Sequence, residues 1–520
     1  MGNAYSSSQQ IAEELASDFL LTAVVVDDEV TYSDATLPKP GETLQVPTLW
    51  EEVSQHATTA RTDRRHDLNA RTLTDEFAEL GLVCSVLPLD EEGKAESRIR
   101  SMSRRSDVIV LDWMVRGNPG DFAIRLIKNI IADDADPDWL RLIAIYTAEV
   151  KLDEIAQAIA EAINVEAEGS TVTHQSLRVR VFSKREYPEE NLPEEIIREF
   201  ARMIDGLLPT TAVAGLAELR KRTYRLIGRF SRDLDAAYWG QRMALIENPA
   251  EAEQHLEHAL SGEIQSLLED CLIGQYAGLD ACRAWVTDFE ASGGNLTERV
   301  RLTGDAATQD IVEFVCELLN YGRSYREGEH NLASNTGWKR CTRLFTRSDE
   351  DAECSNQRFA ALLALKHHHG EPPPRLWSGT ILAEDGDLGT SYWLCVQPRC
   401  DSTGLSGSTR FPLLPLHQES TTGMNALDSS IFSDQGTWHK VKVSRDLGGI
   451  RIITCNPDQG RREVIAIREN GTYYLYHSDG KFRWVGELKA ETAQRAANKL
   501  AAQAARVGVA ESIWLTKIDI

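Results

Sequence analysis

The chain has 520 residues, in which 56 Lys and Arg stand against 80 Asp and Glu, so the formal net charge is −24. At roughly 150 residues per domain, this length predicts three or four domains. The acidic balance argues against an extended nucleic-acid interface, and no stretch approaches the roughly 18 apolar residues of a membrane span. Because no signal peptide is visible and the 9 cysteines form no CxxC pair, we expect a cytoplasmic protein with reduced thiols.

The N-terminal region alternates short buried strands with helices. The first residues, 1–6, fit the loose N-myristoylation pattern, which is too degenerate to predict a modification. Apolar runs of strand length follow, several of them closed by a charged or hydroxyl residue; they are 23–29, 82–88, 107–112, 142–147 and 177–184. Helical patterns lie between and around them, at 6–19, 67–80, 91–105, 121–132, 152–165 and 192–208.

Such alternation predicts a doubly wound parallel sheet of five strands with helices on both faces. We interpret 31–65, which is rich in Pro and charge, as an insertion, and the polar segment 166–175 as a loop. The polar-apolar alternation of 177–184 is typical of an edge strand. The region 20–208 is therefore expected to be one α/β domain, preceded by a helical tail over 1–19.

The rest of the chain changes character twice, so the fold class is multidomain: α/β, then α, then β. Residues 209–365 are helix-rich and include a long amphipathic helix over 216–237, and 366–375 is a His- and Pro-rich linker. Residues 376–520 form a β-rich α+β domain, in which Asn470-Gly471 and Asp479-Gly480 predict hairpins. A helix over 490–507 and a strand over 512–518 are expected to close the chain.

Reactive side chains follow four of the five expected parallel strands. They are Asp27, Asp28, Asp112, Thr147 and Lys184. In an open α/β sheet such residues gather at the C-terminal ends of the strands. Three carboxylates in one pocket repel one another unless a hard cation such as Mg²⁺ binds them. One carboxylate could then attack a phosphoryl donor, while a lysine and a hydroxyl bind the phosphoryl oxygens.

This ordered set resembles the receiver domain of two-component response regulators, over about 20–208. The resemblance implies the flavodoxin-like order of the five strands. The resemblance implies that Asp112 accepts a phosphoryl group from a histidine kinase, and that Thr147 and Lys184 contact that group. It implies a Mg²⁺ site whose ligands are Asp27, Asp28, Asp112 and the backbone carbonyl of Met114. Beyond this phosphorylation chemistry the resemblance implies no enzymatic activity.

The sequence departs from the receiver pattern after the lysine. Lys184 is followed by Arg185 where receivers have proline, and the position of the usual switch aromatic is Val181, with Phe182 adjacent. We therefore expect intact phosphorylation chemistry and an altered switch. The apolar Met114 beside the acceptor predicts slow hydrolysis of the acyl phosphate.

The inserted receiver joined to a region without a DNA-binding motif looks like the stand-alone receiver proteins of Detocs-type antiviral two-component systems. This resemblance implies a phosphate sink or regulator that has a histidine kinase and a receiver-fused effector as partners. We expect no membrane partner, the acidic charge disfavours nucleic acid, and a homodimer is compatible with the sequence. Three alternatives stay open. They are an effector enzyme in 376–520 near Cys400 or Asp401, a DNA-binding regulator using Arg220, Arg222 and Arg225, and a scaffold whose C-terminal domain binds a partner. A metal site at His367–His369 is disfavoured because the linker supplies no further ligands.

Overall fold

The computed structural model describes residues 7–31, 68–88, 94–115, 118–133, 139–245, 251–302, 311–322, 341–368, 372–386, 389–418, 429–443 and 449–504. The myristoylation pattern at 1–6, most of the insertion and the strand expected at 512–518 lie outside these residues. Contacts divide the chain into two compact units. The first unit takes the described parts of 1–226, 264–294 and 312–320, and the second unit takes those of 227–263, 295–311 and 321–520. Within the described part of the chain, no helix is long and apolar enough to cross a membrane.

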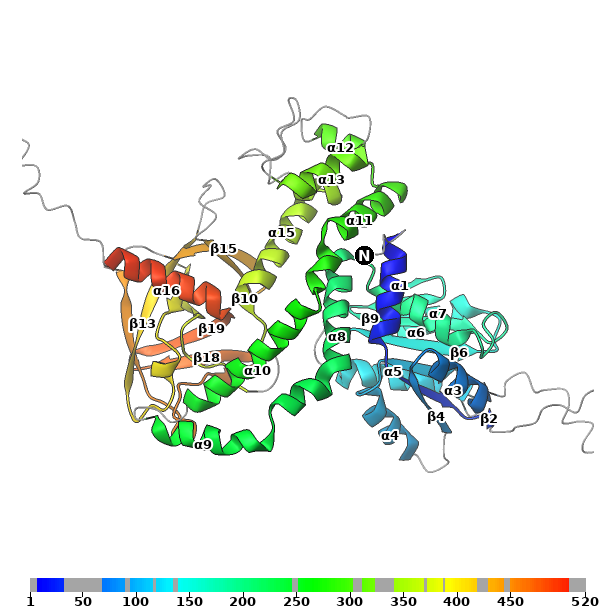
Figure 1. The fold of residues 1–520 in the computed structure, drawn as a ribbon, viewed down its shortest axis with the longest axis horizontal. Helices are drawn as coiled ribbons and strands as arrows, with labels where there is room; N and C mark the ends of the chain where they lie inside the picture. Colours follow the sequence, from blue (N-terminus) through cyan, green and yellow to red (C-terminus); the bar gives the residue numbers. More distant parts are fainter. Residues whose placement is uncertain are drawn as a thin grey trace, which may run out of the picture. The chain divides into compact units, whose positions relative to one another are not determined.

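The first unit is built on a sheet of seven strands in the order β4-β1-β5-β6-β9-β8-β7 (Figure 1). Their bounds are β1 Thr22–Asp27, β4 Val83–Pro88, β5 Val108–Asp112, β6 Arg141–Thr147, β7 Ala167–Glu168, β8 Thr171–His174 and β9 Leu177–Ser183. The first five strands in this order pair in parallel. They are the five strands that the sequence predicts, in the flavodoxin-like order.

The prediction of five strands is wrong at one edge, where the supposed loop 166–175 forms β7 and β8. These two strands pair with each other, and β8 pairs antiparallel with β9, from Thr171 opposite Arg180 to His174 opposite Leu177. β9 is therefore not an edge strand. Its polar alternation has another cause, because Arg178 and Arg180 form ion pairs with the buried carboxylate of Glu199.

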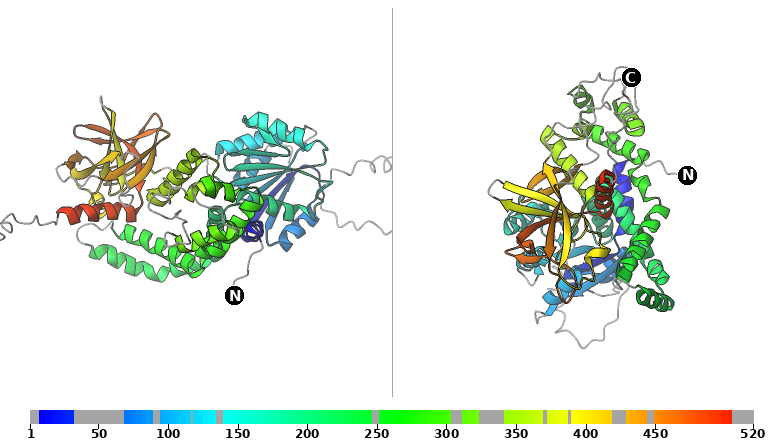
Figure 2. Two further views of the ribbon diagram at one scale, coloured as in Figure 1. Left: turned by 90° about the horizontal axis from the view of Figure 1, so that it is seen from above. Right: turned by 90° about the vertical axis from the view of Figure 1, so that its left-hand side faces the viewer.

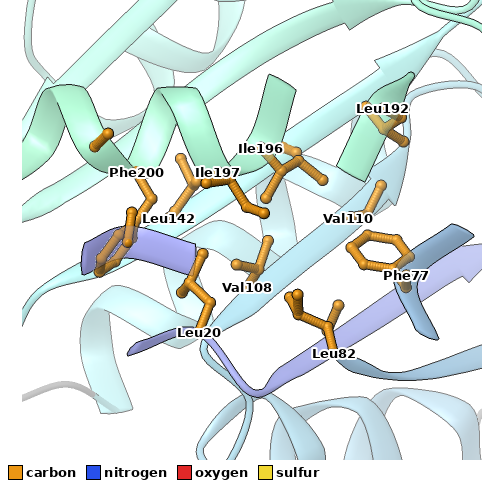
Figure 3. Close-up of a cluster of buried hydrophobic side chains, with 14 of the residues drawn as sticks. Leu20, Phe77, Leu82, Val108, Val110, Leu142, Leu192, Ile196, Ile197 and Phe200 are labelled. Atoms are coloured by element: carbon orange, nitrogen blue, oxygen red, sulfur yellow. The ribbon is translucent and has the colours of Figure 1, made fainter. Parts of the chain in front are cut away.

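Helices cover both faces of this sheet, and the alternation of side chains along each strand decides which face they meet (Figures 1 and 2). Val25, Val108 and Val110 pack with α1 (Ser8–Phe19), α3 (Ala70–Glu79) and α7 (Leu192–Met203), as Figure 3 shows in part. Val24 and Val26 point to the other face, against α4 (Lys94–Ser103), α5 (Asp121–Asp133) and α6 (Leu152–Ile163). Strands buried on both faces explain the continuous apolar runs of the sequence.

The sequence predicts two long helices over 192–208 and 216–237, and the structure has different boundaries for both. α7 ends at Met203, and α8 spans Leu207–Arg229. The break falls at Asp205-Gly206, and Pro209 fits the first turn of α8, where no backbone donor is needed. Beyond Arg229 the chain forms a 3₁₀ turn over Arg232–Leu234 and then α9 (Asp235–Ala244).

Further helices complete the two units. They are α10 (Glu251–Asp270), α11 (Leu279–Ala291), α12 (Leu296–Leu302), α13 (Ile311–Tyr321), α15 (Asp349–Ala364) and α16 (Ala490–Ala504). α11 contacts α1, where the backbone N–H of Ser8 donates to Asp288 Oδ2 over 2.6 Å. The N-terminus of α1 is thereby tied to a helix about 280 residues away in the chain.

The second unit contains an antiparallel sheet of ten strands, ordered β14-β15-β13-β12-β11-β19-β18-β17, with β10 beside β19 and β16 beside β13. Their bounds are β10 Leu365–Lys366, β11 Thr380–Gly386, β12 Gly389–Cys395, β13 Thr409–Gln418, β14 Ser429–Asp434, β15 Thr437–Val443, β16 Arg451–Cys455, β17 Ile467–Glu469, β18 Thr472–His477 and β19 Gly480–Leu488. The hairpin predicted at Asn470-Gly471 is confirmed, with φ of 49° and 85° in the turn between β17 and β18. One end of the expected linker joins this sheet, since Lys366 belongs to β10, and at the other end Arg375 forms an isolated antiparallel bridge with Ile465.

Candidate functional site

The C-terminal edge of the parallel sheet collects the side chains that the sequence singles out. β1 ends at Asp27, β5 at Asp112 and β6 at Thr147, and Lys184 directly follows β9. β5 lies between β1 and β6, and β6 pairs with β9, so these ends are neighbours in space. The register places Asp112 opposite Tyr146, and Thr147 opposite Ser183.

Lys184 joins two of the carboxylates. Its Nζ lies 3.0 Å from Asp27 Oδ2 and 3.1 Å from Asp112 Oδ1. The three side chains are only 8%, 3% and 9% exposed, so water screens this ion pair poorly. Asp27 and Asp112 precede Lys184 by 157 and 72 positions in the chain, and the order of the strands brings all three together.

Burial and charge act against each other on these groups. Burial, and then the negative charge of Asp27, raise the pKa of Asp112 above its usual value, although Lys184 opposes that shift. Burial alone would lower the pKa of Lys184, but the charges of Asp112 and Asp27 outweigh it and leave that pKa above its ordinary value. The lysine is therefore a permanent cation at neutral pH.

Backbone donors hold the second oxygen of each carboxylate. The N–H of Met114 donates to Asp112 Oδ2 over 2.8 Å, and the N–H of Glu29 donates to Asp27 Oδ1 over 2.8 Å. Both are turns in which an Asp side chain accepts from the backbone two residues later. Each carboxylate is thus oriented by its own loop before any ligand arrives. Asp28, beside Asp27, is half-buried.

Thr147 belongs to the same rigid edge. Its side chain is fully buried, and its Oγ1 accepts a hydrogen bond from the N–H of Glu149 over 3.2 Å. Its carbonyl accepts from the backbone N–H of Lys184 over 2.7 Å. The end of β6 and the start of the loop after β9 are therefore fixed to each other.

The donor chemistry of the site fits a hard divalent cation. Two carboxylates, Asp27 and Asp112, meet at this edge, and Asp28 follows Asp27 in the chain; the ammonium of Lys184 contacts both Asp27 and Asp112. In the part of the chain that the structure describes, no group of three or more His, Cys, Asp or Glu is arranged to hold a metal as it stands. A cation would therefore need a small rearrangement of these side chains.

Two tyrosines that the sequence analysis did not single out complete the surroundings of Lys184. The ring of Tyr146 lies 5.4 Å from Lys184 Nζ, and its hydroxyl donates to the carbonyl of Tyr187 over 2.8 Å. The only signal in the sequence is an aromatic residue directly before Thr147. At the altered switch position, Val181 and Phe182 are both buried and point to opposite faces of the sheet.

Both ends of the insertion return to this edge. β2 (Val30–Thr31) pairs in parallel with β3 (Leu68–Asn69), just after the acidic pair of β1. The backbone N–H of Asn69 donates to Glu189 in the loop after Lys184 over 3.2 Å. The chain therefore leaves the sheet and rejoins it beside the candidate site.

The residues of the rival hypotheses lie elsewhere and are engaged differently. Both terminal nitrogens of Arg220 contact Asp107 at 2.9 Å, and Arg222 contacts Cys271. Arg225 is exposed. The hypothesis of a basic DNA-binding face is therefore weakened, because two of the three arginines already contact other side chains.

The candidate residues of the C-terminal region show no arrangement typical of a catalytic site. Cys400 is exposed, and its thiol donates to Asp401 Oδ1 over 3.4 Å. In the segment 366–375, which the sequence suggests is a linker, the ring of His368 packs against Tyr473 and Trp484. His369 lies outside the described residues. His368 therefore packs with aromatic rings and does not support the metal site that the sequence analysis disfavoured.

Comparison with known proteins agrees with this geometry. No curated protein sequence matches the chain. A family model described as "Response receiver domain" matches residues 19–188. This range begins just before β1 and ends just after Lys184, so it contains every strand of the seven-stranded sheet and every residue of the candidate site. Residues 19–188 are thus similar to a response receiver domain, and this similarity covers about a third of the chain.

Proposed function

We propose that this protein is the phosphoacceptor of a two-component phosphorelay, in which Asp112 takes a phosphoryl group from a histidine kinase. The observation that carries the proposal is the bridge of Lys184 between Asp27 and Asp112 at the C-terminal edge of the sheet. A carboxylate that is buried, oriented by a backbone N–H and paired with a fixed cation is prepared for attack on phosphorus.

In the proposed reaction, a carboxylate oxygen of Asp112 attacks the phosphorus of phosphohistidine. The new P–O bond forms as the P–N bond breaks, and the imidazole leaves with the electron pair of that bond. Lys184 moves its ammonium from the carboxylate to the phosphoryl oxygens, and the hydroxyl of Thr147 donates to another of them. The loop after β5 keeps Asp112 oriented through the N–H of Met114.

The proposal assigns a Mg²⁺ site to Asp27, Asp28, Asp112 and the backbone carbonyl of Met114. When bound, the cation would neutralise the charge of the phosphoryl oxygens during transfer. The oxygen-only donor set and the surplus of carboxylates over cations at this edge support the assignment.

On the resemblance to Detocs-type systems, we assign the protein the role of a phosphate sink or regulator in bacterial antiviral defence. In this role it draws phosphoryl groups from a histidine kinase and competes with a receiver-fused effector. The half-buried, apolar Met114 next to the acceptor supports long retention, because it offers no group that orients an attacking water.

Intact-mass analysis of the full chain after incubation with acetyl phosphate and Mg²⁺ tests the phosphoacceptor. The wild type should gain one phosphoryl mass, whereas Asp112→Asn should gain none. Asp121→Asn, at the exposed start of α5, is the matched control and should react like the wild type. Equal incorporation in Asp112→Asn and in the wild type would refute the assignment, and so would no incorporation from either acetyl phosphate or a phosphorylated kinase.

The sink role has its own test, which is the lifetime of the phosphoprotein after the donor is removed. A sink should retain the label through many turnovers of a kinase and should slow labelling of a competing receiver in the same mixture. Rapid loss of the label, with no effect on labelling of the competitor, would refute the sink role without contradicting the assignment of Asp112 as phosphoacceptor.

A further inference from the structure

Among the residues that the structure describes, none covers a face of helix α9 in the second unit. None of its 10 residues is buried, and two large apolar side chains are exposed, Trp239 at 59% and Met243 at 81%. Leu234, in the turn before the helix, is 53% exposed. Helices shorter than roughly 12–15 residues are marginal in water without packing, and clustered exposed apolar side chains mark interaction sites.

The contacts that α9 makes to α10 are polar and exposed. Gln241 Nε2 lies 2.8 Å from His255 Nδ1, and Arg242 pairs with Glu253 at 2.7 Å. Such surface contacts contribute little to stability. They place α9 against its neighbour but leave its apolar residues uncovered.

The charges of α9 identify a fitting occupant. The helix has an acid in its first turn, Asp235, and a base in its last turn, Arg242. Trp239 lies between them, four residues after Asp235 and three before Arg242. A second α9 running antiparallel across a twofold axis at Trp239 therefore sets each Asp235 beside the Arg242 of the other copy. The same arrangement aligns the helix dipoles favourably and stacks the exposed apolar residues at the centre.

We propose that α9 is a self-association surface through which two copies of this chain pair antiparallel about Trp239. The interface is isologous, so every contact occurs twice. The apolar centre comes from Leu234, Trp239 and Met243, and the flanks come from the two Asp235–Arg242 pairs. This inference does not depend on the phosphorylation chemistry.

Sedimentation velocity of the full chain over a range of concentrations tests the pairing. The wild type should be a dimer, and Trp239→Ala should weaken dimerisation by at least about tenfold, because a central aromatic carries much of the energy of an interface. Trp139→Ala is the matched control, since Trp139 in the first unit is 50% exposed and should leave the dimer unchanged.

Charge exchange makes the geometry itself testable. Asp235→Arg places two arginines opposite each other at both flanks, and Arg242→Asp does the same with two aspartates, so each variant alone should be monomeric. An equimolar mixture of the two should dimerise, because both flanking pairs in the mixed dimer are then of opposite charge.

The proposal is overturned if the wild type is monomeric, or if the mixture associates no better than either variant alone. It is also overturned if the chain is monomeric while Trp239 is protected from a fluorescence quencher. That result would place another part of the same chain on α9.

Discussion

Replacing Lys184 by methionine should show how much the buried ammonium of Lys184 contributes to the free energy of unfolding of the first unit. At the distances of 3.0 and 3.1 Å, each ion pair is worth about 5 kcal/mol at an effective dielectric constant of about 20. Much of this is offset by the cost of burying the charges. Removing one partner of a buried pair typically costs about 3–5 kcal/mol, because uncompensated charge stays behind. We therefore expect Lys184→Met to destabilise the first unit by about 3 kcal/mol at neutral pH.

Hydrogen exchange of the full chain, read by peptide mass spectrometry, measures this loss locally. A loss of about 3 kcal/mol corresponds to roughly a hundredfold faster exchange in peptides from β1 and β5, if these amides open with the unit. Lys151→Met is the control, since Lys151 forms an ion pair of 2.6 Å with Glu154 on the exposed surface and should change nothing measurable. Equal protection in Lys184→Met and in the wild type would refute the reasoning, as would equal losses in both variants.

Two further substitutions test other parts of the fold. Gly120→Ala should destabilise the loop after β5, since Gly120 has a φ of +80° and a Cβ there would lie 2.3 Å from the ring of Trp113; exchange in that loop should rise, and unchanged exchange would contradict the steric argument. Arg483→Met should destabilise the second unit by about 3 kcal/mol at neutral pH, because it leaves the buried carboxylate of Asp434 unpaired. Burial raises the pKa of Asp434, but hydrogen bonds from Arg483 and Tyr392 bring it below its usual value, so the pair stabilises fully above about pH 4 and progressively less as the pH falls. Calorimetry should therefore show the difference from the wild type shrinking in acid, and a difference independent of pH would refute this account.

The sequence predicts the parallel sheet because its strands are buried on both faces. The runs that contain Val24 to Val26 and Ile109 to Leu111 have no polar face, which is the pattern of a parallel strand between two helical layers. The order of the strands follows from the resemblance to receiver domains, not from these short-range patterns. With that order, the ends of the strands follow, and with them the meeting of Asp27, Asp112 and Lys184.

The edge hairpin of β7 and β8 could not be predicted in the same way. Its residues include Glu168, Gly169 and Thr171, which resemble a loop in composition. The strand forms because the backbone groups of β9 need partners, and β8 supplies them. The polar face of β9 was equally misleading, because its arginines meet Glu199, a buried acid on a helix that the sequence pattern cannot place opposite them.

Contacts of side chains with long separation also escape the sequence. The hydroxyl of Tyr146 meets the carbonyl of Tyr187, which is 41 residues away, and Arg220 meets Asp107, which is 113 residues away. Such pairs depend on rotamers and on the exact approach of helix and loop, which no periodicity encodes. The sequence pattern therefore cannot name the partner of each arginine in α8, although Arg220 fastens α8 to the start of β5.

The charges at the sheet edge explain why the lysine and a divalent cation would have different roles. With Asp27, Asp28 and Asp112 ionised and Lys184 protonated, the formal charge of the group is about −2. In the proposed reaction, phosphorylation of Asp112 removes the charge of its carboxylate but adds a phosphoryl group of about −2, so the edge becomes more negative by about one unit. Lys184 is present before and after this step and cannot offset that increase, although it can move with the phosphoryl group. An added divalent cation can offset this increase in negative charge. It therefore lowers the electrostatic free energy of the phosphorylated state more than that of the resting state. Loss of Lys184 should therefore weaken the folded resting state, whereas removal of the cation should mainly prevent phosphorylation.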